Sequence, residues 1–342
     1  MESSLKSFVP NGGASAFVPA GPNSQQQQQQ QARQSPLTCT GHTRPVVDLC
    51  FSGIVNGGVD YFMISACKDS VPIFRNGKTG QYIGSFNGHK GAVWSSKLSP
   101  DATLSATGSA DFTCKVWDNV TGQPIATMEH SHIVRTVDIS VDSRYVLTGG
   151  FEKKVRIFDL KNNSAAGGKE TAIRCFEGFN NEIKSALLES NLGIAFVADG
   201  KELRVWDLRT SAQVSTRGFD DAISSLRFSH DRRFLICTSG KKVHFFDTVS
   251  AQLLRTFETT IQLSSASLHP DGSRFVVGGS SDLWVRVYDW VSGQEKEVYK
   301  GHHGPIHCVS YSPDGHLYAS GSEDGTVRLW QTIPGAVYGL WQ

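Results

Sequence analysis

The stretch Gly301–Gln331, GHHGPIHCVSYSPDGHLYASGSEDGTVRLWQ, carries the clearest structural signal in this chain of 342 residues. After its Gly-His start, apolar and polar residues alternate as they do in a half-buried strand. A Ser-Pro-Asp-Gly turn at 312–315 precedes a second strand of small residues, and a Glu-Asp-Gly turn at 323–325 precedes a third that ends at Trp330. The stretch therefore predicts three antiparallel strands joined by tight turns.

The same pattern recurs along most of the chain. Counting back from Trp330, equivalent positions follow one another at intervals of 40 to 48 residues; they are Arg75, Trp117, Phe158, Trp206, Phe246, Tyr288 and Trp330. The one long interval contains a polar insertion at 161–171. A Gly-His start, a Trp-Asp-like end and this period are the signature of the WD40 repeat, one blade of a β-propeller. Seven such units predict an all-β, seven-bladed WD40 propeller.

Two regions of unlike composition divide the chain. Residues 1–35 are rich in serine, glycine and glutamine, with an unbroken glutamine run at 25–31, and cannot bury enough apolar surface to offset the entropy of ordering. We expect them to form a disordered tail, and residues 36–342 to form the propeller. The segment 37–40 has no blade before it in the sequence, so we expect it to join the last blade as its outer strand and close the ring.

The tail contains a short segment that fits the pattern N-x-x-A-x-x-F-x-P. Its defining residues are Asn11, Ala14, Phe17 and Pro19. The pattern resembles the motif through which protein tails bind the C-terminal domain of poly(A)-binding protein, and it implies that protein as a partner of the tail. The alternative is a glutamine-rich linker with incidental aromatic residues.

The bulk properties of the chain argue against several classes of function. A net charge of +1 gives no reason to expect nucleic acid or a membrane as the main partner, and no apolar run approaches the roughly 18–20 residues that span a bilayer. The seven cysteines include no C-x-x-C pair, which favours a reduced, intracellular protein without a zinc or disulfide framework. The sequence also lacks a Gly-rich phosphate loop and a G-x-S-x-G motif. We expect no enzyme, no cofactor and no metal.

Four polar positions recur in the best-formed units: a loop histidine, a strand serine or threonine, a turn aspartate and a tryptophan. Serine, histidine and aspartate together suggest a hydrolase, but a nucleophile is not expected at the same place in several blades. We therefore interpret the set as a buried hydrogen-bond network, in which every polar group finds a partner. Its members are His89, Thr107, Asp111 and Trp117 in the second unit, and His302, Ser320, Asp324 and Trp330 in the seventh.

Two further sets of residues are candidates for partner binding. Arg75 stands where the first unit should have an aromatic residue; we expect it to mark a family-specific surface, and the alternative is a degenerate blade. Positions three and five after the loop histidine, and the position before the turn aspartate, lie around the mouth of a propeller channel. They predict a basic and aromatic sector that docks a peptide or acidic segment, because Trp and Arg are enriched at binding hot spots. The alternative is a solvated mouth. The sector comprises Lys68, Trp94, Arg135, Phe151 and Lys184, with His307 at the same level in the last unit.

Several stretches resemble one family beyond the general repeat, over about residues 36–341. They include PLTCTGHTRPVVDLCF at 36–51, GHKGAVWS at 88–95, ADFTCKVWD at 110–118 and YGLW at 338–341. They are similar to the serine–threonine kinase receptor-associated protein family, also called Unr-interacting proteins. A related family, and the alternative assignment, is the WD40 subunit of a translation initiation factor.

The resemblance implies a non-catalytic adaptor of the survival-of-motor-neuron complex, which assists Sm-core assembly on spliceosomal RNAs for pre-mRNA splicing. The implied partners are Sm-like Gemin subunits and an RNA-binding translation regulator, so that RNA is contacted only indirectly and no membrane is involved. The implied location is the cytoplasm and the nucleus. The alternative function is that of the initiation-factor subunit, or of an mRNA-linked translation adaptor.

Overall fold

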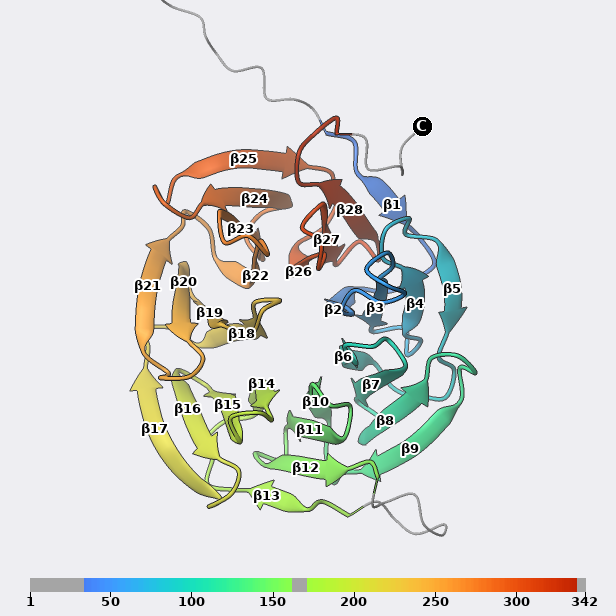
Figure 1. Ribbon diagram of the computed structural model, residues 1–342, viewed down its shortest axis with the longest axis vertical. Coiled ribbons are helices and arrows are strands. Elements are labelled where there is room, and N and C mark those ends of the chain that lie inside the picture. Colours follow the sequence, from blue (N-terminus) through green and yellow to red (C-terminus); the bar gives the residue numbers. More distant parts are fainter. Residues whose placement is uncertain (1–33, 162–170, 337–342) are drawn as a thin grey trace, which may run out of the picture. The chain divides into compact units, whose positions relative to one another are not determined.

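The structure is a computed structural model that describes residues 34–161 and 171–336. These residues form seven antiparallel sheets of four strands each, arranged in a ring around a common axis (Figure 1). The prediction of an all-β, seven-bladed propeller is confirmed. The expected disordered tail and its motif residues Asn11, Ala14, Phe17 and Pro19 lie outside the described residues.

In each blade the strands follow one another from the axis outward. The first three blades are β2 (Val46–Phe51), β3 (Phe62–Cys67), β4 (Ile73–Asn76) and β5 (Tyr82–Ser85); β6 (Val93–Leu98), β7 (Leu104–Ser109), β8 (Thr113–Asp118) and β9 (Pro124–Glu129); and β10 (Val134–Ile139), β11 (Tyr145–Gly150), β12 (Val155–Asp159) and β13 (Arg174–Phe176).

The remaining blades repeat this arrangement, and the last contains the first strand of the chain. They are β14 (Ile183–Glu189), β15 (Ile194–Asp199), β16 (Glu202–Asp207) and β17 (Ala212–Gly218); β18 (Ile223–Phe228), β19 (Phe234–Ser239), β20 (Lys242–Asp247) and β21 (Leu253–Glu258); β22 (Leu263–Leu268), β23 (Arg274–Gly279), β24 (Trp284–Asp289) and β25 (Glu295–Lys300); and β26 (Ile306–Tyr311), β27 (Leu317–Ser322), β28 (Val327–Gln331) and β1 (Leu37–Cys39).

The ring closes through β1. This strand pairs antiparallel with β28, with Leu37 opposite Leu329 and Cys39 opposite Val327. The pairing gives the last blade its fourth strand from the start of the propeller sequence. An open array would leave unpaired strand edges, which closure removes.

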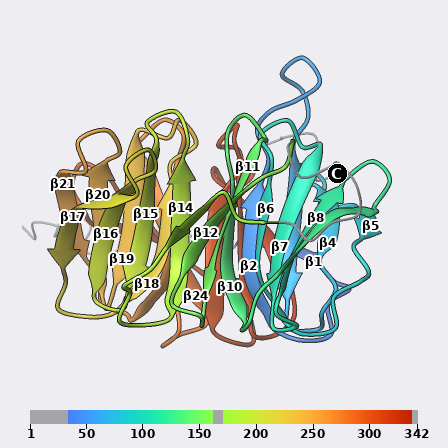
Figure 2. The same ribbon diagram turned by 90° about the horizontal axis from the view of Figure 1, so that it is seen from below.

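The core lies between neighbouring blades. The second strands are sandwiched on both faces, and all six residues of β27 are buried, whereas all seven residues of the outer strand β17 are exposed. One apolar cluster joins blades one and seven through Val46 and Leu49 on one side and Leu329 on the other. Figure 2 shows the strands of all blades running between two loop-bearing faces. The described part of the chain contains no helix of the length and apolarity that a membrane crossing needs.

All seven inner strands contain the same irregularity near the axis. In each, the pairing register shifts between the first and third residues, as between Val46 and Asp48 in β2 and between Val93 and Ser95 in β6. Such a bulge changes the direction of the neighbouring side chains. The second and third residues of the inner strands consequently both line the central cavity.

Candidate functional site

The recurring polar residues form the expected hydrogen-bond networks in blades two and seven. His89 contacts Asp111 Oδ2 through Nδ1 at 2.8 Å and Thr107 Oγ1 through Nε2 at 2.7 Å, while Trp117 Nε1 donates to Thr107 Oγ1 at 2.8 Å. The corresponding distances among His302, Asp324, Ser320 and Trp330 are 2.9, 2.7 and 2.8 Å. These contacts tie a loop to two strands and satisfy buried groups, which is a structural task.

The turn aspartates are electrostatically adapted to these networks. Burial alone would raise the pKa of Asp111, but hydrogen bonds from His89, Thr113 and the Lys90 amide hold it well below its usual value. Asp324 shows the same balance, with His302 as the main hydrogen-bond partner that lowers its pKa. Both carboxylates are therefore ionised in the folded protein at neutral pH, where they accept hydrogen bonds.

A partial network in blade one brings together His42, Cys67 and Asp69, the one group of metal-ligand type within the described residues. The candidate ligand atoms of this group already make hydrogen bonds. His42 contacts Asp69 at 3.0 Å and Ser65 at 2.8 Å, and the Cys67 thiol donates to the Arg44 carbonyl at 2.9 Å. Burial also raises the pKa of Cys67 to about 12, so at neutral pH the thiol keeps the proton that it donates to the Arg44 carbonyl. The geometry is that of a structural network.

Arg75 does not form a surface, and that prediction is wrong. Its side chain is buried, with the residue only 4% exposed. The guanidinium donates to the Gly80 carbonyl at 3.1 Å and to the Thr40 carbonyl, and burial lowers its pKa. It turns inward because it occupies the place of the missing aromatic ring, and Thr40, just beyond β1, presents a carbonyl there. Arg75 therefore ties the closing segment to blade one.

The predicted mouth residues are brought together around a cavity on the axis, with a volume of about 510 Å³. The second residues of all seven inner strands line it: Val47, Trp94, Arg135, Lys184, Ser224, Ser264 and His307. Lys68, from the turn between β3 and β4, lines it as well. Five of the six predicted sector residues thus share one cavity.

Trp94 is the centre of the basic sector. The Arg135 guanidinium carbon lies 3.9 Å from the centre of the Trp94 ring, and Lys68 Nζ lies 5.5 Å from it. Both are cation–π contacts, which are strongest where the cation is partly desolvated. Burial lowers the pKa of Arg135, opposed by the charges of Asp48 and Glu182.

The cations of the sector differ in how far they are neutralised. Lys68 lies 3.8 Å from Glu323, which also contacts His307 at 2.5 Å. Lys184 lies 3.8 Å from Glu182. The side chain of Arg135, by contrast, makes no hydrogen bond or ion pair within the part of the chain that the structure describes. Its guanidinium is thus available to an anionic group that enters the mouth.

Phe151 does not line the cavity, contrary to the prediction. Its ring stacks on His132 at a centroid distance of 5.2 Å and an interplanar angle of 11°, and it is 41% exposed. Its amide donates to the Ile133 carbonyl, as the Lys68 amide donates to Pro45 in blade one, so the backbone position is the expected one. The side chain turns away because the imidazole offers it a stacking partner.

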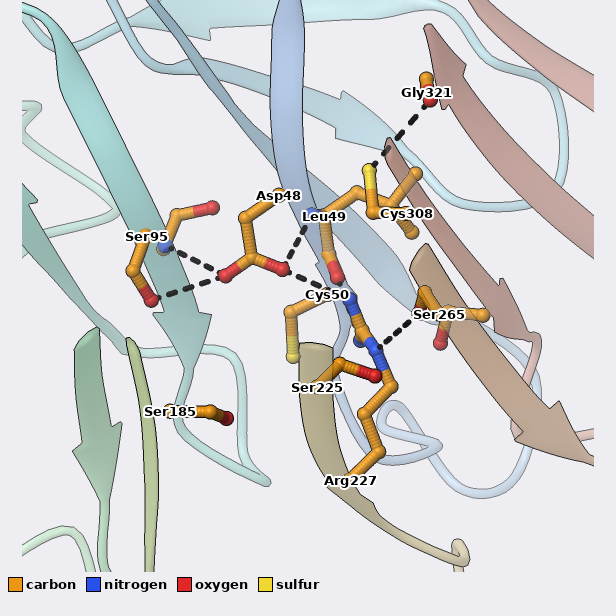
Figure 3. Close-up of polar contacts among 12 residues, drawn as sticks. Asp48, Leu49, Cys50, Ser95, Ser185, Ser225, Arg227, Ser265, Cys308 and Gly321 are labelled. Atoms are coloured by element: carbon orange, nitrogen blue, oxygen red, sulfur yellow. Dashed lines mark hydrogen bonds and ion pairs between the residues drawn. The ribbon is translucent and has the colours of Figure 1, made fainter. Parts of the chain in front are cut away.

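Sequence reasoning missed an ion pair that crosses the channel (Figure 3). Arg227 in β18 donates from Nη2 to Asp48 Oδ1 in β2 at 2.8 Å, and from Nη1 to the Leu49 carbonyl at 3.0 Å. Its Nε donates to Ser265 in β22 at 3.2 Å. Arg227 therefore joins blade five to blades one and six. A signal was present, because Asp48 is the only acid among the seven third positions: Asp48, Ser95, Thr136, Ser185, Ser225, Ser265 and Cys308.

The third positions also explain why Arg227 matters to the ring. In four successive blade junctions their side chains accept a hydrogen bond from an amide of the next blade. The pairs are Ser96 to Asp48, Val137 to Ser95, Ala186 to Thr136 and Leu226 to Ser185, at 3.1 to 3.3 Å. Within the described residues the equivalent bond is absent at the other three junctions. Those three junctions lie between blades five and one by way of blades six and seven. Arg227, in blade five, bonds to blades six and one.

Comparison with known proteins assigns the family. The family description "WD domain, G-beta repeat" matches residues 80–118, 122–159, 211–247 and 293–331. The chain is 51% identical to the serine-threonine kinase receptor-associated protein of Homo sapiens over 310 residues, covering 91% of this chain and 86% of the relative. It is 45% identical to the protein of that name from Dictyostelium discoideum, covering 87% and 99%. Eukaryotic translation initiation factor 3 subunit I of Bombyx mori is 29% identical, covering 86% and 94%.

The fold and these likenesses point to a non-catalytic scaffold that acts through protein–protein contacts. The similarity to the first two relatives extends over nearly the whole propeller and is far above that to the initiation-factor subunit. This chain belongs to the serine-threonine kinase receptor-associated protein family of WD40 proteins.

Proposed function

We propose that the chain is a scaffold of the survival-of-motor-neuron complex and assists Sm-core assembly on spliceosomal RNAs. The observation that carries this proposal is the 51% identity, over 310 residues, to the serine-threonine kinase receptor-associated protein of Homo sapiens. The resemblance of this chain to that family implies the role in Sm-core assembly. The proposed protein partners are Sm-like Gemin subunits and an RNA-binding translation regulator. The proposed places of action are the cytoplasm and the nucleus.

The channel mouth is the proposed docking point for an acidic segment of a partner. Arg135 lacks an anionic partner within the described residues and lies on the face of Trp94, and Lys184 stands on the next blade. An incoming carboxylate would pair with a guanidinium that is already held in place, so little side-chain entropy is lost on binding. The tail segment Asn11–Pro19 is a separate proposed contact, with poly(A)-binding protein.

A second candidate function is that of a translation-initiation-factor subunit. It is favoured by the 29% identity to subunit I of initiation factor 3, which covers most of both chains. The two candidates predict different companions in the cell. Sm and survival-of-motor-neuron proteins should copurify in the first case, and other subunits of the initiation factor in the second.

Affinity purification of the tagged full chain from eukaryotic cells tests the proposal. We expect Sm and survival-of-motor-neuron proteins to be recovered, and the double variant Arg135→Glu/Lys184→Glu to lose them at unchanged melting temperature. A matched control is Arg233→Glu/Lys161→Glu, which reverses two exposed cations at the opposite ends of the strands. Recovery of initiation-factor subunits in place of Sm proteins would replace the first function with the second. Equal recovery by the mouth variant and the control would remove the mouth as the docking point.

A further inference from the structure

One turn of the ring holds an aromatic residue in an unfavourable backbone conformation. In four blades the residue after the turn acid is left-handed, with φ of 72° at Ser70, 67° at Phe112, 56° at Lys153 and 76° at Gly325. Glycine adopts this region without steric cost, whereas a bulky residue there is an outlier. Phe112 therefore holds its turn at a cost in folding free energy that Gly325 avoids in the equivalent turn of blade seven.

The Phe112 ring does not recover this cost by entering the core, because the residue is 43% exposed. It lies against His132 at a centroid distance of 5.4 Å, and His132 in turn stacks on the exposed Phe151 at 5.2 Å. We call these three residues the aromatic row. Backbone strain and contiguous exposed apolar surface both concentrate where proteins bind something.

The aromatic row is continuous with the channel mouth. His132 stands three residues before Arg135 on the segment that leads into β10, and the Phe151 amide bonds the Ile133 carbonyl between them. Three extended residues span roughly 10 Å at most. The exposed rings and the unpaired guanidinium of Arg135 therefore lie within reach of one short extended peptide.

We propose that the aromatic row and Arg135 form one docking track for an extended acidic segment of a partner protein. A carboxylate of that segment pairs with Arg135, and an apolar side chain about three to four residues away lies against Phe112 and Phe151. This proposal rests on the proposed scaffold function. It adds an apolar contact to the carboxylate contact at Arg135, and it specifies the number of partner residues between the two. A peptide fits this track better than RNA, because one segment can carry both a carboxylate for Arg135 and an apolar side chain for the exposed rings. A net charge of +1 also gives the chain no general attraction for a phosphate backbone.

Site-specific photocrosslinking in the full chain tests the proposal. A benzoylphenylalanine is placed at position 112, with the same group at Val291, a 77% exposed residue after β24, as background. After irradiation in eukaryotic cells, we expect position 112 to crosslink to a protein segment that carries an aspartate or glutamate within about four residues. Arg135→Glu should reduce that yield about tenfold, as loss of a hot-spot contact does. A crosslink to RNA, a yield no higher than at Val291, or a yield unchanged by Arg135→Glu would overturn the proposal.

Phe112→Gly separates binding from folding, because it removes the ring and the backbone strain together. Ser70→Gly is its matched control, since it relieves the same left-handed turn in blade one without removing a ring. We expect both variants to melt at or above the wild-type temperature, and only Phe112→Gly to lose the crosslinked partner, by about tenfold. A lower melting temperature for Phe112→Gly would mark the row as structural and refute the docking track, as would full recovery of the partner. If the partner is neither an Sm nor a survival-of-motor-neuron protein, the proposed function fails and the track stands.

Discussion

Removing the Arg227 side chain tests whether the ion pair across the channel stabilises the ring. Arg227→Met keeps an apolar stem of similar length but deletes the hydrogen bonds to Asp48, the Leu49 carbonyl and Ser265. The Arg227 and Asp48 side chains are only 11% and 15% exposed, so solvent screens their attraction little. A hydrogen bond between charged groups contributes about 1.5–3 kcal/mol and other hydrogen bonds about 1 kcal/mol each. Allowing for water that replaces some of these contacts, we expect a loss of about 3 kcal/mol.

Asp48→Asn supplies the second arm of a double-mutant cycle. The amide keeps the shape of the side chain and an oxygen that can accept from Ser95 and the Ser96 amide, but the charge that pairs with Arg227 is gone. Because each single variant breaks the same contact, the two losses should fall short of additivity by about 1.5–3 kcal/mol.

Thermal unfolding followed by circular dichroism measures these effects. In a domain of this size about 1 kcal/mol corresponds to about 2 °C, so Arg227→Met should melt about 6 °C below the wild type. Arg233→Met is the control, because that side chain is 77% exposed and its carboxylate neighbour Asp231 lies 4.0 Å away, a surface pair of little value. An Arg227→Met protein that melts with the control, or a cycle in which the losses add in full, would refute the stabilising role of the bridge.

Three further outcomes follow from the described contacts. Arg75→Met should destabilise the ring by about 2–3 kcal/mol, because the carbonyls of Thr40 and Gly80 lose the guanidinium as a donor, the second of them in a buried contact; an unchanged melting temperature would contradict that role. Deleting residues 1–34 should leave the melting temperature unchanged, whereas deleting 1–41 removes β1 and should abolish cooperative melting, so equal behaviour of the two truncations would count against closure by β1. Burial lowers the pKa of His130 and of His244 to about 4, so both bind protons more readily when unfolded. Their contribution to stability should be complete above about pH 6.5 and lost as the pH falls through 4. Melting from pH 7 to pH 4 should show this loss, and a His130→Gln/His244→Gln protein that loses as much stability would exclude these residues as its source.

The number of blades was predictable because each repeat carries its own signals. Alternating strands, tight turns and the Gly-His and Trp-Asp positions act over a few residues, so a period in the sequence translates directly into a period in the fold. The same locality made the networks of His89 and His302 readable, since their partners recur at constant spacing. The positions around the mouth were also predictable, because the same bulge directs the second residue of every inner strand towards the cavity.

Side-chain directions were predicted less well. Arg75 was predicted to lie on a surface because a charged residue stands there in place of the aromatic residue of the other units. Most of the equivalent aromatic residues, Trp117 among them, are buried, and that position also buries Arg75. There its guanidinium donates to the Thr40 carbonyl, 35 residues earlier in the chain. Phe151 has the backbone position expected of a mouth residue, yet its ring follows the His132 imidazole. Arg75 thus follows the direction of its repeat equivalents, whereas in Phe151 a neighbour outside the four recurring positions determines the direction.

The contacts that join the two sides of the channel could not be read from the period. Arg227 and Asp48 are separated by 179 residues and occupy different positions in their strands. A repeat identifies which residues are equivalent, and here it established the all-β ring of seven blades and the set of residues around its mouth. Which of those residues meet across the axis, and which cation stays unpaired, depends on the radius at which the ring closes. That radius is a property of the packing between blades, and no single repeat contains it.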